Sequence, residues 1–253
     1  MSKNLIEKFK SLFSHRTLAD AVSADSSRNY EYYNVLSPKS PYNVAESYRR
    51  LYANITYLPL EGKCRKIAIT SALGGEGKTT VAVNLAITLA QNLNSAKILL
   101  VDTDLRKPGV NLMLSQDFLR RGLSEFLSGA DEVPNILTTS VAGLSVLFSG
   151  DISENPTRLI SSERMGELFR YCADHFDYII LDTPALEVAA EALLMKKHIN
   201  GYVLVAKSKE SDVDSLSKAI ESLRVVEAPI LGMVLTGAEV KRQKRAKSVF
   251  RRR

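Results

Sequence analysis

One short segment combines glycines, a lysine and hydroxyl side chains at a spacing that could hold an anion. Ala72–Thr80 reads ALGGEGKTT, follows the apolar run KIAIT and precedes a helix-like apolar run. Gly74, Gly75 and Gly77 permit a tight turn whose backbone N–H groups converge on one point. The pattern [AG]-x4-G-K-[ST] in a strand–loop–helix context predicts a phosphate-binding loop, in preference to a glycine-rich turn with a chance Lys-Thr pair.

The side chains of this loop are suited to MgATP. Lys78 would reach the β- and γ-phosphates, and the Thr79 hydroxyl would be a Mg²⁺ ligand. A helix that begins near Lys78 would also direct the positive end of its dipole toward the phosphates. The expected ATP contacts are Gly74, Gly75, Glu76, Gly77, Lys78, Thr79 and Thr80.

Three carboxylates follow apolar runs further along the chain. Asp102 and Asp104 come directly after KILLV, and Asp182 comes after YIIL. Because ligands of parallel sheets bind at the carboxyl ends of the strands, these acids can face the γ-phosphate and its metal. The alternative for each is an N-cap or an ordinary acid after a strand.

Short apolar runs alternate with helical patterns from Arg65 onward, which predicts an α/β fold of the P-loop type. The sheet should be mostly parallel and covered by helices on both faces. The expected strands are Lys66–Thr70, Lys97–Val101, Leu144–Phe148, Tyr178–Leu181, Gly201–Ala206 and Ile230–Leu235. The expected helices are 43–58, Lys78–Asn92, Ser161–His175, Leu186–Lys197 and Val213–Arg224.

Three regions are expected along the chain. Residues 1–40 would form an amphipathic helix at 2–13 and a flexible linker, 41–240 the P-loop domain as the one large core, and 241–253 a basic tail. The net charge is +6, yet the tail holds eight Lys or Arg and no acid, while the rest has 26 basic and 28 acidic residues. A nucleic-acid surface across the body is therefore not expected.

The sequence also predicts a cytoplasmic protein. No apolar run approaches the ~20 residues that span a bilayer, and the first residues have no secretory signal pattern. Cys64 and Cys172 match no metal or redox spacing, so we expect reduced thiols. The tail could attach peripherally to an anionic membrane, bind RNA or DNA without specificity, or be merely solvated.

Several segments together resemble the bacterial protein-tyrosine kinases of capsule and exopolysaccharide synthesis. The resemblance runs from about Pro41 to Gly237. The segments that carry it are ESYRRLYANI, SALGGEGKTT, ILLVDTDLRKP, GLSEFLSG, GLSVLFSGDISENPTRLISSERM and YIILDTPA. DLRKP is the most diagnostic. The septum-site and partition ATPases look similar but carry a signature Lys where this chain has Leu73.

The resemblance implies transfer of the ATP γ-phosphoryl group to protein tyrosine. The catalytic residues would be Lys78, Asp102, Asp104 and Asp182, with Thr79, Asp104 and Asp182 around Mg²⁺. Asp102 would accept or orient the tyrosine proton, and Arg106 could balance charge near the substrate. The implied partners are protein tyrosine substrates, further copies of the chain and a separate transmembrane polysaccharide co-polymerase.

The chain departs from the family pattern at two places that bear on assembly. The usual C-terminal tyrosine cluster is missing, so Tyr30, Tyr32 and Tyr33 are candidate acceptors, or else ordinary linker aromatics. On the family's ring-forming helix Glu46 and Arg49 match, but Tyr52 stands at the second Arg position and Arg50 is offset. Two alternatives therefore remain: a regulatory ATP-binding module that is no kinase, and a positioning ATPase of the partition type.

Overall fold

The computed structural model describes residues 35–37, 39–114 and 121–238. The predicted amphipathic helix at 2–13, the candidate acceptors Tyr30, Tyr32 and Tyr33, and the basic tail at 241–253 lie outside these ranges. Val35 packs against the core, and the Leu36 N–H donates to Asn84 Oδ1 at 2.7 Å. Contacts with the domain thus begin before residue 41, the expected domain boundary.

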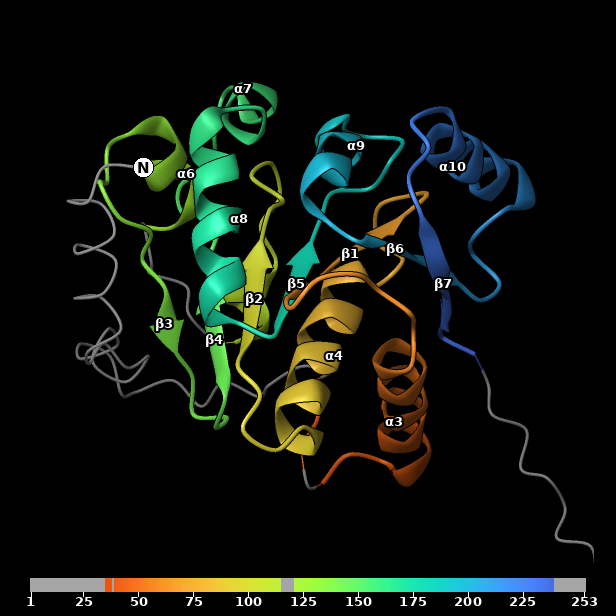
Figure 1. The fold of residues 1–253 in the computed structure, drawn as a ribbon. Coiled ribbons are helices and arrows are strands. Elements are labelled where there is room, and N and C mark those ends of the chain that lie inside the picture. Colours follow the sequence, from red (N-terminus) through yellow and green to blue (C-terminus); the bar gives the residue numbers. More distant parts are fainter. Residues whose placement is uncertain (1–34, 38, 115–120, 239–253) are drawn as a thin grey trace, which may run out of the picture.

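A seven-stranded sheet with the order β3-β4-β2-β5-β1-β6-β7 forms the centre of the fold (Figure 1). Neighbouring strands are parallel except β3, which pairs antiparallel with β4. The strands are β1 Arg65–Ser71, β2 Ile98–Asp102, β3 Leu137–Thr138, β4 Leu144–Leu147, β5 Tyr178–Asp182, β6 Gly201–Lys207 and β7 Ile230–Thr236. The predicted mostly parallel α/β fold is confirmed.

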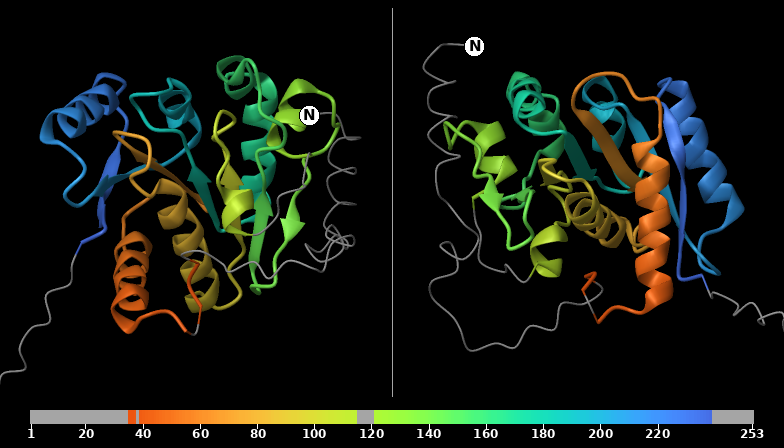
Figure 2. Two further views of the ribbon diagram at one scale, coloured as in Figure 1. Left: turned by 180° about the vertical axis from the view of Figure 1, so that it is seen from behind. Right: turned by 60° about the horizontal axis from the view of Figure 1, so that its bottom comes forward.

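Helices cover both faces of the sheet centre. Alternate residues of β5 divide between two apolar clusters: Tyr178 and Ile180 pack with α4, and Ile179 and Leu181 pack with α8. Helix α3 lies beside α4 in both views of Figure 2. The helices are α3 Tyr42–Thr56, α4 Lys78–Asn92, α5 Val110–Met113, α6 Leu123–Ser128, α7 Pro156–Ile160, α8 Glu163–His175, α9 Glu191–Leu194, the 3₁₀ helix η1 Met195–His198 and α10 Val213–Val225.

The helix predicted over Leu186–Lys197 is wrong in its first part. The Leu186 and Glu187 N–H groups donate to Ser71 O at 2.9 Å and Ala72 O at 3.2 Å. These bonds hold residues 186 and 187 along the end of β1 in a turn, and α9 starts only at Glu191. The segment is thereby fastened to the phosphate-binding loop.

The edge strand β7 is another exception to the prediction, because it is not covered on both faces. Ile230, Met233 and Leu235 are exposed, whereas Leu231 and Val234 pack against the core. No helix in the described ranges is long and apolar enough to cross a membrane.

His198, at the end of η1, is an imidazole kept neutral by its surroundings. Its ring stacks on Phe169 with centroids 5.1 Å apart, and its Nε2 is buried and bonds to none of the described residues. Burial, with the charges of Lys197, Lys66 and Arg170, lowers the pKa of His198 to about 4.

This depressed pKa predicts a specific loss of stability in acid. An unfolded histidine titrates near pH 6.5, so the stabilisation is present above that pH and is lost as the pH falls toward about 4. Urea unfolding at pH 7 and pH 5 should show a smaller loss for His198→Phe than for the wild type. His175→Gln, which removes another imidazole, is the control. Equal losses in His198→Phe and the wild type would contradict the assignment.

Candidate active site

The phosphate-binding loop between β1 and α4 has a backbone that glycine adopts readily. Gly75 and Gly77 have φ of +80° and +94°, in the left-handed region, and Gly77 caps α4. A Cβ on Gly77 would also lie 3.4 Å from Thr236 Cγ2. The N–H groups at the start of α4 are thus left available for an anion at the helix N-terminus.

Glu76 anchors this loop with its side chain. Its Oε2 accepts from the Leu73 N–H at 2.8 Å, and its Oε1 accepts from the Ser211 hydroxyl. The Thr236 hydroxyl donates to Glu76 O at 2.7 Å. Among the predicted ATP contacts, Glu76 therefore has only its backbone N–H to offer a phosphate. Its carboxylate holds the loop to Ser211, which follows β6, and its backbone carbonyl holds the loop to Thr236 at the end of β7.

Thr79 and Asp182 meet at the carboxyl end of β5. Thr79 Oγ1 donates to Asp182 Oδ2 at 2.6 Å, and Asp182 is 1% exposed. Asp182 Oδ1 is buried and bonds to none of the described residues. A hydroxyl and a half-satisfied carboxylate beside a phosphate cradle fit a divalent cation with oxygen ligands.

The described residues hold no preformed cage of three or more acidic, His or Cys side chains. Mg²⁺ in nucleotide sites usually keeps several waters and takes one or two carboxylates plus substrate phosphates.

Asp102 lies opposite Asp182 in the register of β2 and β5. It is fully buried. Its Oδ2 accepts from the Gly109 and Val110 N–H groups, both at 3.1 Å, and its Oδ1 accepts from the Asp104 N–H at 3.1 Å. Asp102 thus organises the loop after β2, a role that sequence reasoning missed.

Burial raises the pKa of both neighbouring carboxylates, Asp102 and Asp182. Burial raises the pKa of Asp102 to about 7 against three backbone hydrogen bonds that lower it. Burial and the charge of Asp102 raise the pKa of Asp182, opposed by the Thr79 hydrogen bond and the Lys78 charge. Such a pair stores electrostatic repulsion that a bound cation would relieve.

The expected residues of DLRKP lie in a turn after β2. Asp104 Oδ1 accepts from the Arg106 N–H at 3.3 Å and the Lys107 N–H at 2.9 Å. The Arg106 guanidinium donates from Nη2 to Glu191 Oε1 at 2.7 Å. Nothing in the spacing of the sequence pointed to Glu191, because it stands in an apolar stretch expected to be an ordinary helix.

Gly109 lies against Thr79, the predicted Mg²⁺ ligand. A Cβ on Gly109 would be 3.0 Å from Thr79 Oγ1 and 3.1 Å from Thr79 Cγ2, with no strain from its φ of −134°. The loop after β2 therefore closes tightly over Thr79, a second contact that sequence reasoning missed.

The predicted oligomer helix α3 packs against α4, the helix that follows the phosphate-binding loop. Its Glu46 pairs within the helix with Arg49 at 3.3 Å and with Arg50 at 3.9 Å. The Tyr48 hydroxyl donates to Thr80 O at 3.4 Å, which connects α3 to the start of α4.

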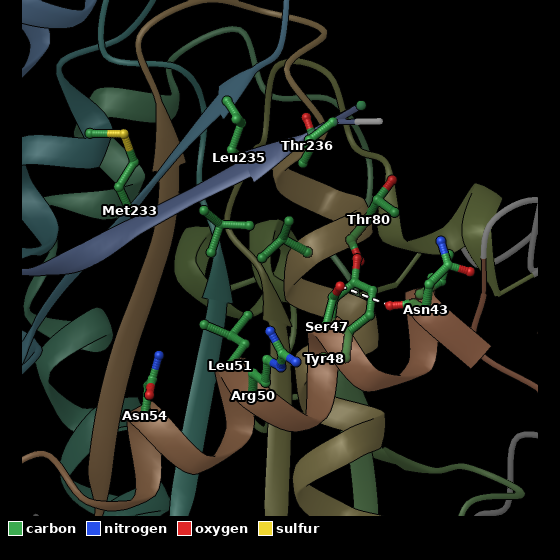
Figure 3. Close-up of a pocket in the computed structure, with 15 residues that line it drawn as sticks. Asn43, Ser47, Tyr48, Arg50, Leu51, Asn54, Thr80, Met233, Leu235 and Thr236 are labelled. Carbon is green, nitrogen blue, oxygen red and sulfur yellow. Dashed lines mark hydrogen bonds between the residues drawn. The ribbon is translucent and has the colours of Figure 1, made fainter. Parts of the chain in front are cut away.

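A cavity of about 440 Å³ opens between α3 and β7 (Figure 3). Asn43, Ser47 and Tyr48 line it from α3, and Thr80 and Thr236 line it beside the phosphate-binding loop. Figure 3 shows Thr80 and the end of β7 on the same side of the cavity as Asn43. Thr80, the last of the predicted ATP contacts, is the residue at which this cavity meets the segment that would hold the phosphates.

Comparison with known proteins agrees with this geometry. A family described as an AAA domain matches residues 64–228. The tyrosine-protein kinase YwqD of Bacillus subtilis (strain 168) is 33% identical over 208 residues, which cover 82% of this chain and 87% of YwqD. The chain belongs to the bacterial tyrosine-protein kinases.

Solved kinase structures show the same fold. The kinase domain of Escherichia coli tyrosine kinase ETK superposes with a TM-score of 0.74, at 26% identity over 90% of each chain. The chimerical protein CapA2B2 gives a TM-score of 0.72 at 33% identity, over 79% of this chain and 86% of that one. The P-loop fold and the family predicted from the sequence are both confirmed.

The contact between Gly109 and Thr79 yields a test of this kinase-family site. Gly109→Ala should force Thr79 to move by a few tenths of an ångström and weaken binding of MgADP by about tenfold. Titration with a fluorescent ADP analogue in excess Mg²⁺ measures this. Gly166→Ala, a glycine in α8 whose Cβ would only touch Arg170 and His198, is the matched control. Equal affinities in the two variants would contradict the role of Gly109.

Proposed function

We propose that this chain transfers the γ-phosphoryl group of MgATP to tyrosine side chains of proteins. The observation that carries the proposal is the Thr79–Asp182 hydrogen bond next to the phosphate-binding loop, together with the buried Asp182 Oδ1, which bonds to none of the described residues. Thr79, Asp104 and Asp182 would hold Mg²⁺, which supplies charge neutralisation at the phosphates. Lys78 and the loop N–H groups would bind the phosphates themselves.

The adenosine part of ATP is assigned to the cavity between α3 and β7. Support comes from Thr80 and Thr236, which line it, and from the polar groups of Asn43, Ser47 and Tyr48 on its wall. Thr236 stands where the family commonly has Asn, so the contacts of the base should differ in detail.

Asp102 and Asp104 would have different roles in phosphoryl transfer. Asp102 would take the proton of the acceptor hydroxyl, because its carboxylate ends β2 directly beside Asp182. Because Asp102 is fully buried under the turn of residues 103–110, that turn has to move when the tyrosine enters. Asp104, at the start of the turn, would help to hold the metal.

The biological setting is inferred from relatives. CpsD of Streptococcus pneumoniae serotype 4 is named a tyrosine-protein kinase, CapB of Staphylococcus aureus is named a putative one, and CapA2B2 is described as a chimerical protein. We propose control of capsular or extracellular polysaccharide synthesis, with a transmembrane co-polymerase as activator and a peripheral position at the inner membrane face. Glu46, Arg49 and Arg50 would serve contacts between copies.

The test is formation of phosphotyrosine by the purified full chain. With MgATP, with and without the cytoplasmic segment of a co-polymerase partner, mass spectrometry should find phosphate on tyrosine. Tyr30, Tyr32 and Tyr33 are the expected sites within the chain. Lys78→Met should lower the yield by more than a hundredfold, because a phosphate-neutralising charge is lost.

Asp102→Asn and Asp104→Asn separate a base from a supporting carboxylate. Asp102→Asn should abolish transfer while MgADP still binds, and Asp104→Asn should weaken both. ATP binding without phosphotyrosine under every condition would contradict the kinase and favour the regulatory module.

A further inference from the structure

One buried carboxylate lies outside the phosphate-binding loop and the three expected acids. Glu191, the first residue of α9, is 2% exposed. Its Oε1 accepts from Arg106 Nη2 and from Thr157 Oγ1, both at 2.7 Å. Glu191 therefore joins three separate segments: the turn after β2, helix α7 and helix α9.

The electrostatics of Glu191 show a charged and strongly held group. Burial alone would raise its pKa, but hydrogen bonds from Arg106 and Thr157 outweigh this and lower it below the ordinary value. Its Oε2 is nevertheless buried and bonds to none of the described residues. An ion pair whose carboxylate is buried with one unsatisfied oxygen contributes little to stability, which favours a functional reason for it.

Arg106, the partner of Glu191, is held by this hydrogen bond and remains partly exposed to solvent. The Arg106 side chain is 45% exposed, and among the described residues its guanidinium bonds only to Glu191. A guanidinium carries five N–H donors. Arg106 is thus a cation held in one place and partly exposed to solvent, an arrangement suited to planar recognition of an anion.

The order of the strands places Arg106 on the acceptor side. The phosphate-binding loop follows β1, Asp182 ends β5, and Arg106 follows β2; these three strands are consecutive neighbours in the sheet. The cavity assigned to adenosine lies in the opposite direction, at β7. The acceptor has to approach beyond the γ-phosphate, and hence from the side of β2.

We propose that Glu191 is a positioning residue that holds Arg106 for binding a carboxylate next to the acceptor tyrosine. This inference rests on the proposed kinase function. It deepens that function by naming the acceptor class: tyrosines flanked by acidic residues. Thr157 donates a second hydrogen bond to the same Glu191 oxygen, so Glu191 links the Arg106 guanidinium to α7, the helix that carries Thr157.

The experiment compares two peptides on four forms of the full chain. One peptide has a tyrosine flanked by glutamates, and the matched peptide has glutamines instead. The forms are wild type, Arg106→Ala, Glu191→Gln and the double variant. The wild type should show a lower KM for the glutamate peptide.

Arg106→Ala should raise that KM about tenfold and remove the preference, with kcat and the KM for ATP changed far less. Glu191→Gln should give an intermediate loss, because an amide oxygen still accepts from Arg106 but carries no charge. If Glu191 acts through Arg106, the double variant should be no worse than Arg106→Ala.

The control is Arg121→Ala, which breaks the Arg121–Asp131 pair at 3.4 Å and should leave the preference intact. Thermal unfolding and MgADP affinity of each form establish that it folds. A preserved preference in Arg106→Ala, or a Glu191→Gln effect on kcat or ATP alone, would overturn the inference. Equal KM values of the wild type for both peptides would overturn it while the kinase function stands. No phosphotyrosine from the wild type would remove both together.

Discussion

The hydrogen bond between Thr79 and Asp182 is the interaction on which the rest of the site depends. It joins the start of α4 to the end of β5, and it requires the β1–β5 register that sets Ile69 opposite Asp182. The main-chain carbonyl of Asp182 contacts the turn after β2: Asp182 O accepts from the Thr103 N–H at 2.9 Å and from the Thr103 hydroxyl at 2.6 Å. One residue thus ties the phosphate-binding loop to the acidic turn after β2.

The strand ends next to this hydrogen bond bury a pair of carboxylates with few compensating charges. Asp102 and Asp182 lie side by side at the ends of adjacent strands, and burial raises the pKa of both. A fold selected for stability alone would avoid such a pair. A divalent cation and phosphates would supply the missing charge balance, so the strain is located where a nucleotide would relieve it.

The sequence predicted those parts of the molecule that follow from local pattern. Gly74–Thr80 with its strand and helix, six of the seven strands and the parallel sheet came from spacing and periodicity. The contacts of Glu76, Gly109 and Glu191 did not, because each depends on residues 30 or more positions away or on a loop path that no periodicity encodes. The start of α9 was missed for the same reason: the amides of residues 186 and 187 bond to the end of β1, which only the tertiary structure reveals.

The most direct measurement is the Mg²⁺ dependence of ADP affinity in the wild type and in Asp182→Asn. Calorimetric titration would be run with excess Mg²⁺ and again with EDTA. If Thr79 and Asp182 form the Mg²⁺ site, the wild type should bind ADP at least about tenfold more tightly with Mg²⁺ than with EDTA. Asp182→Asn should bind ADP equally under both conditions. A full Mg²⁺ dependence retained in Asp182→Asn would contradict the account.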